Sequence, residues 1–275
     1  MLKLLCVLFT ALFATTCTPV SAPIETNEDV RALPIIMYHK VLKSKTGKYT
    51  VTPSQLDADF AAFKNAGFTA VHMREVIDWV NGRGELPAKP IVITFDDGYF
   101  NNVHYGLDIA KKHNTKFGIY PVTSFSKYST ESGDSANPNY SHLTWREMSD
   151  AFATGMVEFG NHTHRMHRFR PRYGIMPVGT ESTNEYHENL RADIKAANDL
   201  IESAGVPRPT TFAYPFGKYS AESRELLIDM GFDALLTCNE KVNKIRRGDP
   251  TCLHSLGRFN RDGNYSTETI LKKIS

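Results

Sequence analysis

The sequence has no marked excess of either charge, no internal repeat and no sign of a second domain. Its 32 Lys and Arg residues are nearly balanced by 30 Asp and Glu residues, which leaves a formal net charge of +2. Because so small a net charge gives no electrostatic basis for binding nucleic acid, we expect no such partner. With 275 residues and 41% hydrophobic content, the chain can bury one sizeable core.

Long apolar runs are also lacking, apart from one at the start of the chain. Leu4 to Ala14 follows a short basic start and is too short to span a bilayer. We predict a secretory leader over residues 1–22, a linker over 23–32 and one folded domain over 33–275. An alternative is a lipoprotein signal cut before Cys17. We therefore expect an exported protein in the periplasm, at the cell surface or anchored at the outer membrane, with membrane association only through a lipidated Cys17.

Cysteine is scarce. Of the four cysteines, Cys6 and Cys17 lie in the leader or at its edge, which leaves Cys238 and Cys252 in the main domain. In an exported protein, two remaining cysteines that flank a loop rich in Lys, Arg and Asn predict a disulfide. Closing that loop would contribute about 3 kcal/mol to stability. Two unpaired thiols are the alternative.

Strand patterns alternate with helical patterns along the chain. Apolar residues recur at helical spacing after Pro53, and Thr144 to Glu147 forms a capping-box pattern at the start of another helix. Short β-favouring runs lie between such segments. This alternation predicts an α/β fold made of βα units with a parallel sheet.

Two adjacent carboxylates follow the strongest strand pattern. The run Ile91 to Phe95 favours a buried strand, and Asp96, Asp97 and Gly98 come directly after it. In α/β folds, ligands bind at the carboxyl ends of parallel strands. Neighbouring side chains there point in different directions, so one aspartate can hold a metal while the other accepts a proton. An Asp-Asp-Gly turn without function is the alternative.

Histidines follow a second strand pattern. The run Met156 to Phe159 leads to His162, His164 and His167. Imidazole is the commonest metal ligand, and one Asp with two His leaves positions open for water and substrate. A surface histidine cluster without function is the alternative for this segment alone. His162 and His164 would share a face of an extended strand, so local geometry does not choose between His164 and His167.

Two motifs resemble those of a known family. Thr94 to Gly98 and the pattern His162-Thr163-x-x-x-His167 resemble the first two motifs of the polysaccharide deacetylases, carbohydrate esterase family 4. The wide spacing of the histidines resembles the branch that removes N-acetyl groups from poly-N-acetylglucosamine. The resemblance extends from about Leu33 to the C-terminus. It implies an irregular (β/α) barrel and favours His167 over His164.

The resemblance also implies a catalytic arrangement. Asp97, His162 and His167 would hold a divalent metal, most simply Zn²⁺, although the same ligands accommodate Co, Ni or Fe. Asp96 would act as general base. The expected reaction is metal-dependent hydrolysis of N-acetyl groups on a polysaccharide that contains N-acetylglucosamine, whether poly-N-acetylglucosamine, a chitin-like chain or peptidoglycan.

The third family motif is present with two departures. Thr211 to Gly217 has Ala213 where the family has the arginine that tethers the catalytic aspartate, and Phe216 where it has a tyrosine. We expect Arg258 to replace the missing arginine beside Asp96. Since the tyrosine acts mainly through its backbone N–H, Phe216 is expected to remain an oxyanion donor.

Two histidines are alternatives for the general acid. His39 ends the apolar run Pro34 to Tyr38, and in the poly-N-acetylglucosamine branch a histidine at this place resembles a substitute for the acid that other members carry near the C-terminus. His254 matches that C-terminal place superficially, but it lies in a basic loop two residues after Cys252 and precedes a strand-like run instead of ending one. We therefore expect His39 to protonate the leaving amine.

Tyr99, Tyr214 and Trp145 are the expected residues for stacking against sugar rings, although each is also a common core residue. An O-deacetylase of an acetylated polysaccharide such as xylan is an alternative function, because ester and amide hydrolysis share this site. A non-catalytic carbohydrate-binding relative, with Ala213 as the sign of a decayed site, is another, but the intact acids and histidines argue against it. A glycosidase needs its two carboxylates more than about 5 Å apart across the sugar, as adjacent aspartates seldom are.

Overall fold

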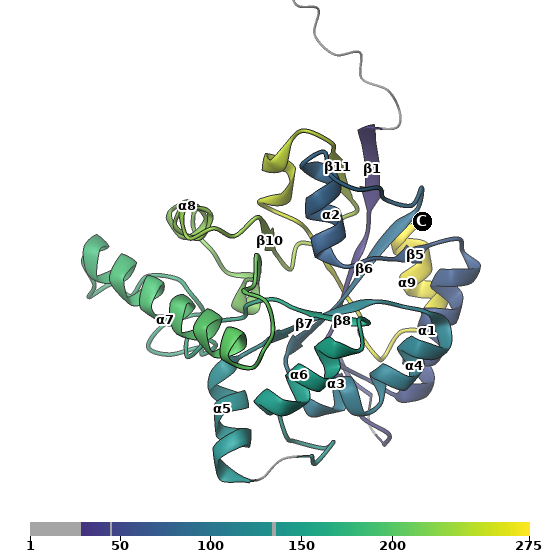
Figure 1. Ribbon diagram of the computed structural model, residues 1–275, viewed down its shortest axis with the longest axis horizontal. Helices are drawn as coiled ribbons and strands as arrows, with labels where there is room; N and C mark the ends of the chain where they lie inside the picture. The colour runs from purple at the N-terminus through teal and green to yellow at the C-terminus, as the bar shows by residue number, and fades with distance from the viewer. Residues whose placement is uncertain (1–28, 45, 134–135) are drawn as a thin grey trace, which may run out of the picture.

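The computed structural model describes residues 29–44, 46–133 and 136–275 (Figure 1). The predicted leader, Cys17 and most of the predicted linker lie outside the described residues. The linker prediction is wrong at its end, because β1 (Val30–Leu33) pairs antiparallel with β11 (Asn243–Arg246) and so belongs to the folded domain. Within the described chain, no helix has both the length and the apolar content needed to cross a membrane.

A parallel sheet forms the centre of the molecule, with the strand order β12-β2-β6-β7-β8. A short strand, β5, pairs with the start of β6, and β9 and β10 form a separate parallel pair. The bounds are β2 (Ile35–Tyr38), β5 (Thr69–Ala70), β6 (Pro90–Asp97), β7 (Phe117–Pro121), β8 (Val157–Phe159), β9 (Thr211–Ala213), β10 (Ala234–Leu236) and β12 (Phe259–Asn260).

Two backbone bridges join these strands into an irregular barrel. Asn161, just after β8, bridges in parallel to Phe212 of β9. Leu236 of β10 bridges in parallel to Leu256, which lies on the segment that continues into β12. The circuit of strands therefore closes, as in the irregular (β/α) barrel that the family resemblance implies.

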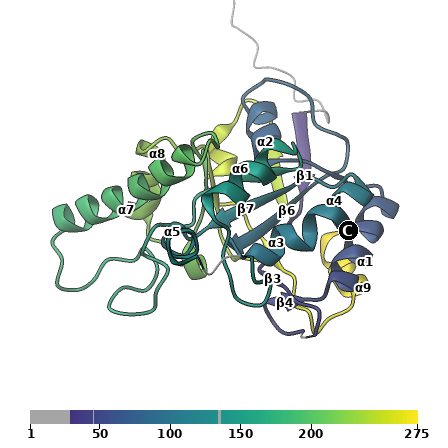
Figure 2. The same ribbon diagram turned by 60° about the horizontal axis from the view of Figure 1, so that its bottom comes forward.

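Helices surround the barrel. In Figure 2, α5, α7 and α8 lie on one side of the sheet, and α1, α4 and α9 lie on the other. The capping boxes at Thr52 and Thr144 are formed, and the second is the one predicted. The helices are α1 (Pro53–Asn65), α2 (Met73–Val80), α3 (Phe100–His104), α4 (Gly106–His113), α5 (Thr123–Ser132), α6 (Trp145–Ala153), α7 (Thr183–Ser203), α8 (Ala221–Asp229) and α9 (Thr267–Ile274).

The central strand β6 separates two parts of the core. Ile91, Ile93 and Phe95 pack in an apolar cluster with residues of α1, α4 and α6, whereas Val92 belongs to the cluster that includes residues of α2. Because side chains alternate along a strand, Thr94 and Asp96 share the side of Val92. The same alternation that buries the apolar residues thus turns Asp96 away from the larger cluster.

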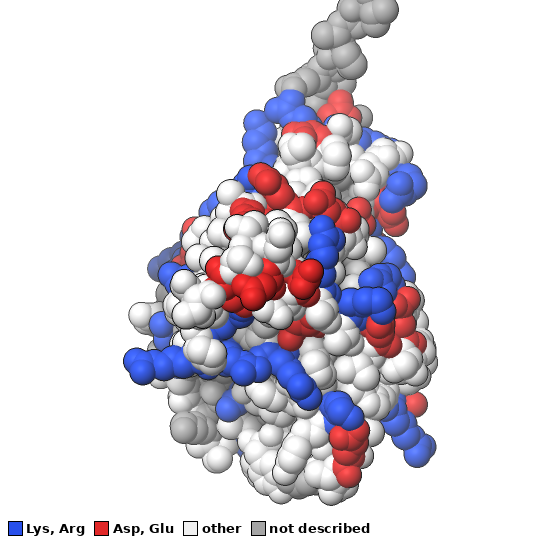
Figure 3. Space-filling view, turned by 90° about the vertical axis from the view of Figure 1, so that its left-hand side faces the viewer, with Lys and Arg blue, Asp and Glu red and all other residues white. Residues whose placement is uncertain are grey.

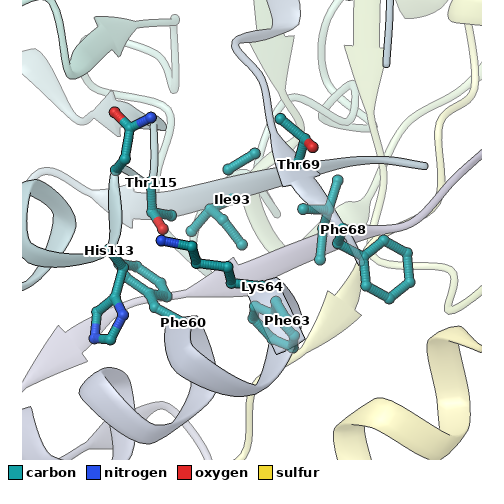
Figure 4. A pocket seen from close by; sticks show the side chains of 11 residues that line it. Phe60, Phe63, Lys64, Phe68, Thr69, Ile93, His113 and Thr115 are labelled. Carbon is teal, nitrogen blue, oxygen red and sulfur yellow. The ribbon is translucent and has the colours of Figure 1, made fainter. Parts of the chain in front are cut away.

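A cavity of about 200 Å³ lies beside β5 and β6 (Figure 4). Its lining includes Phe60, Phe63 and Phe68, together with Lys64 and His113, and it contains no carboxylate. His113 is the one histidine in the lining, and its Nε2 already lies 2.8 Å from Asp57 Oδ1. We therefore assign this cavity to imperfect packing at the edge of the core.

Charges of both signs share the face over α7 and α8. In Figure 3, a stripe of Lys and Arg lies beside clusters of Asp and Glu on this side of the molecule. Ion pairs such as Lys195 with Asp199 and Arg208 with Glu202 contribute to this mixture. This face therefore carries no large patch of a single charge, in keeping with the small net charge of the chain.

Candidate metal centre and active site

The end of β6 places two neighbouring carboxylates in different surroundings. Asp97 has a φ of 69°, in the left-handed region that a non-glycine residue seldom adopts, and such strain costs about 1–3 kcal/mol. Gly98 follows with a φ of 73°, and a Cβ there would lie 2.7 Å from the Cβ of Pro121. Only glycine fits this close approach, so the turn that redirects Asp97 depends on Gly98.

Asp96 forms a buried ion pair with Arg258. The guanidinium donates hydrogen bonds of 2.7 and 2.8 Å to the two carboxylate oxygens, and a third bond from Nε to the Thr237 carbonyl fixes its plane. Burial alone would raise the pKa of Asp96, but the positive charge of Arg258 and its hydrogen bonds outweigh this effect and hold that pKa well below its usual range. Asp96 is therefore ionised, with both oxygens oriented by one side chain.

His162 is held in one orientation by the backbone. Its Nδ1 lies 2.7 Å from the carbonyl oxygen of Ala213, so Nδ1 carries the proton and Nε2 presents its lone pair. That Nε2 lies 3.7 Å from Asp97 Oδ1. Burial lowers the pKa of His162 to about 4, which keeps the ring neutral. A neutral imidazole with a fixed Nδ1–H is the usual state of a metal-binding histidine.

Asp97, His162 and His167 form a group that could hold a metal ion. One ligand atom from each lies within 4.8 Å of the others, and His167 Nε2 is 3.3 Å from Asp97 Oδ1. Asp97 Oδ1 is buried without a hydrogen-bond partner, which is costly unless a cation satisfies it. The donor set of one carboxylate and two imidazoles thus fits a divalent metal such as Zn²⁺.

His164 lies elsewhere. Its Nδ1 is 2.9 Å from Thr123 Oγ1, and its backbone N–H donates to Asp193 at 2.8 Å. His162 and His164 would share a face only if the chain between them were extended, whereas Thr163 has a φ of 76°. The turn therefore sends His164 away from the other two histidines.

Asp97, His162 and His167 lie in the wall of a cavity of about 860 Å³, a volume within the range of known ligand sites. Asp96, Asp97, His162 and His167 all line it, together with His39, Tyr99 and Phe216.

His39 reaches the cavity because β2 and β6 are parallel neighbours. Tyr38 pairs with Phe95, so the next residue, His39, lies at the same edge as Asp96. Its ring lies 4.8 Å from the Tyr49 ring, and its Nδ1 is buried without a partner. Burial lowers the pKa of His39, against the opposing effects of Asp97 and Asp96.

Phe216 packs against Phe169 and Tyr173, and the three rings form an aromatic rim on the cavity. Phe216 sits at a φ of 58° in the short 3-10 turn Pro215–Gly217 after β9. Its ring stacks on Phe169 at 4.2 Å and lies 5.2 Å from Tyr173, and it also packs against His167 at 4.4 Å. Phe169 is 67% exposed and Tyr173 40%, so this rim presents apolar ring surface to anything that enters the cavity.

The expected sugar-stacking residues need correction. Tyr99 lines the cavity, but Tyr214 is fully buried and stacks on Tyr219, and Trp145 begins α6 and packs against the core. Neither Tyr214 nor Trp145 lines the cavity. The aromatic residues that sequence reasoning missed are Tyr49, Phe169 and Tyr173. Their position in polar, irregular segments, where burial is not expected, is the signal that could have identified them.

The predicted disulfide is absent, because Cys238 and Cys252 are free in the structure. Cys238 lines the cavity, with its Sγ 3.8 Å from Met37 Sδ, whereas Cys252 Sγ lies 4.0 Å from the carbonyl of Arg246. Arg246, near Cys252, pairs with Val30 at the start of β1. Met37, near Cys238, lies close to the end of β2, which follows β1 along the chain. The two thiols are thus held toward opposite ends of the barrel. His254 follows Cys252 and is not among the residues that line the cavity.

Comparison with known proteins identifies the family. Residues 83–235, more than half of the chain, match the family described as Polysaccharide deacetylase. The chain belongs to the polysaccharide deacetylase family. Poly-beta-1,6-N-acetyl-D-glucosamine N-deacetylase of Escherichia coli (strain K12) is 24% identical over 211 residues, which cover 68% of this chain and 31% of that protein. The chain thus spans about a third of the length of that relative.

Solved structures give the same fold. A de-N-acetylase from Aggregatibacter actinomycetemcomitans has a TM-score of 0.76 at 21% identity, covering 88% of this chain and 99% of that one. IcaB from Ammonifex degensii has a TM-score of 0.71 at 20% identity, covering 89% and 98%. The predicted fold, a single α/β domain of the polysaccharide deacetylase type, is confirmed.

Proposed function

We propose that this protein is a metal-dependent N-deacetylase of a polysaccharide that contains N-acetylglucosamine, with poly-N-acetylglucosamine as the best-supported polymer. The observation that carries the proposal is the juxtaposition, in one cavity, of the group Asp97, His162 and His167 with an ionised aspartate that does not belong to it. The printed name of the Escherichia coli relative supports the choice of polymer. O-deacetylation of an acetylated polysaccharide is the alternative, since the same groups suit an ester.

Asp97, His162 and His167 would hold the metal, most simply Zn²⁺, with Co, Ni or Fe as alternatives. When bound there, a divalent cation would acidify water and polarise the acetyl carbonyl. His162 stays neutral and correctly oriented without rearrangement, since its Nδ1–H is already bonded to Ala213. The site therefore needs little reorganisation to bind an ion.

Asp96 is the general base in this proposal. Arg258 keeps its carboxylate ionised and fixes both oxygens, so a water proton would be accepted at a defined position. Phe216 would donate its backbone N–H to the oxygen that becomes negative as the acetyl carbon is attacked. Its left-handed conformation, rare for a phenylalanine, is consistent with a turn shaped for such a contact.

His39 would protonate the amine as the C–N bond breaks. Burial lowers its pKa, which makes the protonated ring a stronger acid, and the nearby Asp97 and Asp96 favour the protonated form. The unpartnered Nδ1 leaves hydrogen-bonding capacity on the ring for a group in the cavity.

Acetate release over a panel of glycans tests the function. We expect release from N-acetylglucosamine polymers after metal loading, loss of release after chelation, and recovery when metal is restored. The panel contains poly-N-acetylglucosamine, chitin oligomers and acetylxylan. Release from acetylxylan alone would establish the O-deacetylase, and no release from any glycan at full metal occupancy would contradict a catalytic function.

His39→Ala is expected to retain bound metal and to lose turnover, most severely on amides. An amine must be protonated to leave, whereas an activated ester with a good leaving group needs little acid assistance. We expect an amide loss of about 10²–10⁴-fold and a much smaller ester loss. His254→Ala is the matched control, and an equal loss in that variant would contradict the assignment of His39.

We also propose that residues 1–22 form a leader that exports the protein to the periplasm or cell surface, with lipidation at Cys17 as the alternative signal. Mass spectrometry of the protein recovered from cells tests this. A mature chain that begins near residue 23 supports the leader, one that begins at a lipid-modified Cys17 supports the alternative, and an intact Met1 contradicts both.

A further inference from the structure

Three aromatic rings around the cavity already have a protein cation on one face. Aromatic faces attract cations, so an aromatic-lined sugar site would normally favour a positively charged sugar. Here each ring has an ammonium group within 6 Å of its centroid. The pairs are Lys40 with Tyr99 at 4.7 Å, Lys48 with Tyr49 at 5.3 Å and Lys218 with Tyr173 at 5.9 Å.

The carboxylates of the cavity do not neutralise these lysines. Asp96 is paired with Arg258, and Glu240 is paired with Lys273 at 2.9 Å. Asp97 belongs to the proposed metal ligands, and a divalent ion there would more than compensate its charge. Among the described residues, neither Lys40 nor Lys48 has an ion-pair partner, and both line the cavity. The loaded cavity is therefore positively charged.

On the basis of the proposed function, we propose that Lys40 and Lys48 discriminate between substrates by the charge of the sugar next to the target sugar. Each N-acetyl group removed leaves an amine, which is protonated to an ammonium ion. A sugar chain with such an amine next to the target would bring a cation toward Lys40 and Lys48, whereas a fully acetylated chain is neutral. The enzyme would thus avoid sites beside its own product and leave isolated amines along the polymer instead of continuous runs.

The expected effect is moderate. In water, two unit charges about 8 Å apart change an equilibrium by roughly 2.3-fold, so two lysines together give about five-fold. Salt should weaken the effect, since charges of this kind are screened within about 10 Å at 0.1 M. A role of the lysines in folding or in shaping the cavity would not respond to salt in this way.

The test compares two oligosaccharides that differ only in charge. Both are pentamers of N-acetylglucosamine with one altered sugar beside the target. The altered sugar is glucosamine in one pentamer and glucose in the other, so both lack the same acetyl group. At a pH at which the amine is protonated, we expect kcat/KM to be about five-fold lower for the glucosamine pentamer at low salt, and nearly equal for the two at high salt.

Two variants test whether Lys40 and Lys48 cause the difference in kcat/KM between the two pentamers. Lys40→Gln combined with Lys48→Gln should bring the ratio of the two kcat/KM values to about one at low salt. Lys244→Gln, on β11 and outside the cavity lining, is the matched control and should keep the wild-type ratio. A wild-type ratio near one, or an unchanged ratio in the double variant, would overturn the inference while leaving the deacetylase function intact. Failure of the proposed function is a separate result, in which the metal-loaded enzyme releases no acetate even from the fully acetylated pentamer.

Discussion

Asp96→Asn is expected to bind metal as the wild type does and to lower kcat by about 10²–10⁴-fold, the usual contribution of a positioned general base. Asparagine has nearly the same shape and can still accept a hydrogen bond from Arg258, but it does not take a proton from water. Since Asp96 is not one of the three proposed metal ligands, its substitution leaves Asp97, His162 and His167 in place. The measurement is acetate release at saturating metal, together with metal content of the purified variant.

The same substitution should also lower stability, and this needs its own control. Arg258 is fully buried, and leaving its charge without a partner typically costs about 3–5 kcal/mol. The double variant Asp96→Asn with Arg258→Met removes both charges, so we expect it to regain much of the lost Tm and to remain as inactive as the single variant. Near wild-type turnover in Asp96→Asn at full metal occupancy would show that the proton acceptor lies elsewhere.

Local sequence patterns predict those parts of the fold in which local and tertiary preferences agree. The strand β6 is buried along its whole length, and its uninterrupted run of β-favouring residues shows this directly. The capping box at Thr144 likewise defines the start of α6. By contrast, residues 127–140 are rich in Ser, Asn and Gly, a composition typical of a surface loop, yet α5 extends to Ser132. Ser126 and Ser129 are buried in this helix, so tertiary packing overrides a weak helix propensity there.

In the candidate site too, sequence patterns indicate some residues, whereas other contacts depend on the tertiary structure. The acid pair and the histidines stand out because each directly follows a strand pattern. The contact of Arg258 with Asp96 joins residues 162 positions apart and exists only because the barrel closes beside β12. A resemblance to the family suggested that contact, whereas spacing alone could not. Phe169 and Tyr173 of the aromatic rim were missed because they come from irregular loops, in which no periodicity indicates where a side chain points.

His162→Ala is expected to lose bound metal and turnover together. Its Nε2 is one of three grouped donors, and removal of a direct ligand should weaken metal binding by more than the 10–100-fold typical of outer-shell partners. The fold should survive, because the affected group lies at the end of the strands and its removal does not interrupt the barrel. Metal content and acetate release are measured on the same preparation, and the melting temperature is compared with that of the wild type.

His164→Ala is the matched control for this prediction, since it removes the same side chain two residues away. His164 bonds to Thr123 and Asp193 and is not part of the ligand group, so its loss should leave both metal content and turnover near wild type. The reverse outcome, with metal lost in His164→Ala and kept in His162→Ala, would mean that the turn at Thr163 does not separate the two rings in solution. The left-handed conformation of that one residue thus keeps His164 out of the proposed ligand group, because it breaks the alternation by which a strand would have placed His162 and His164 on one face.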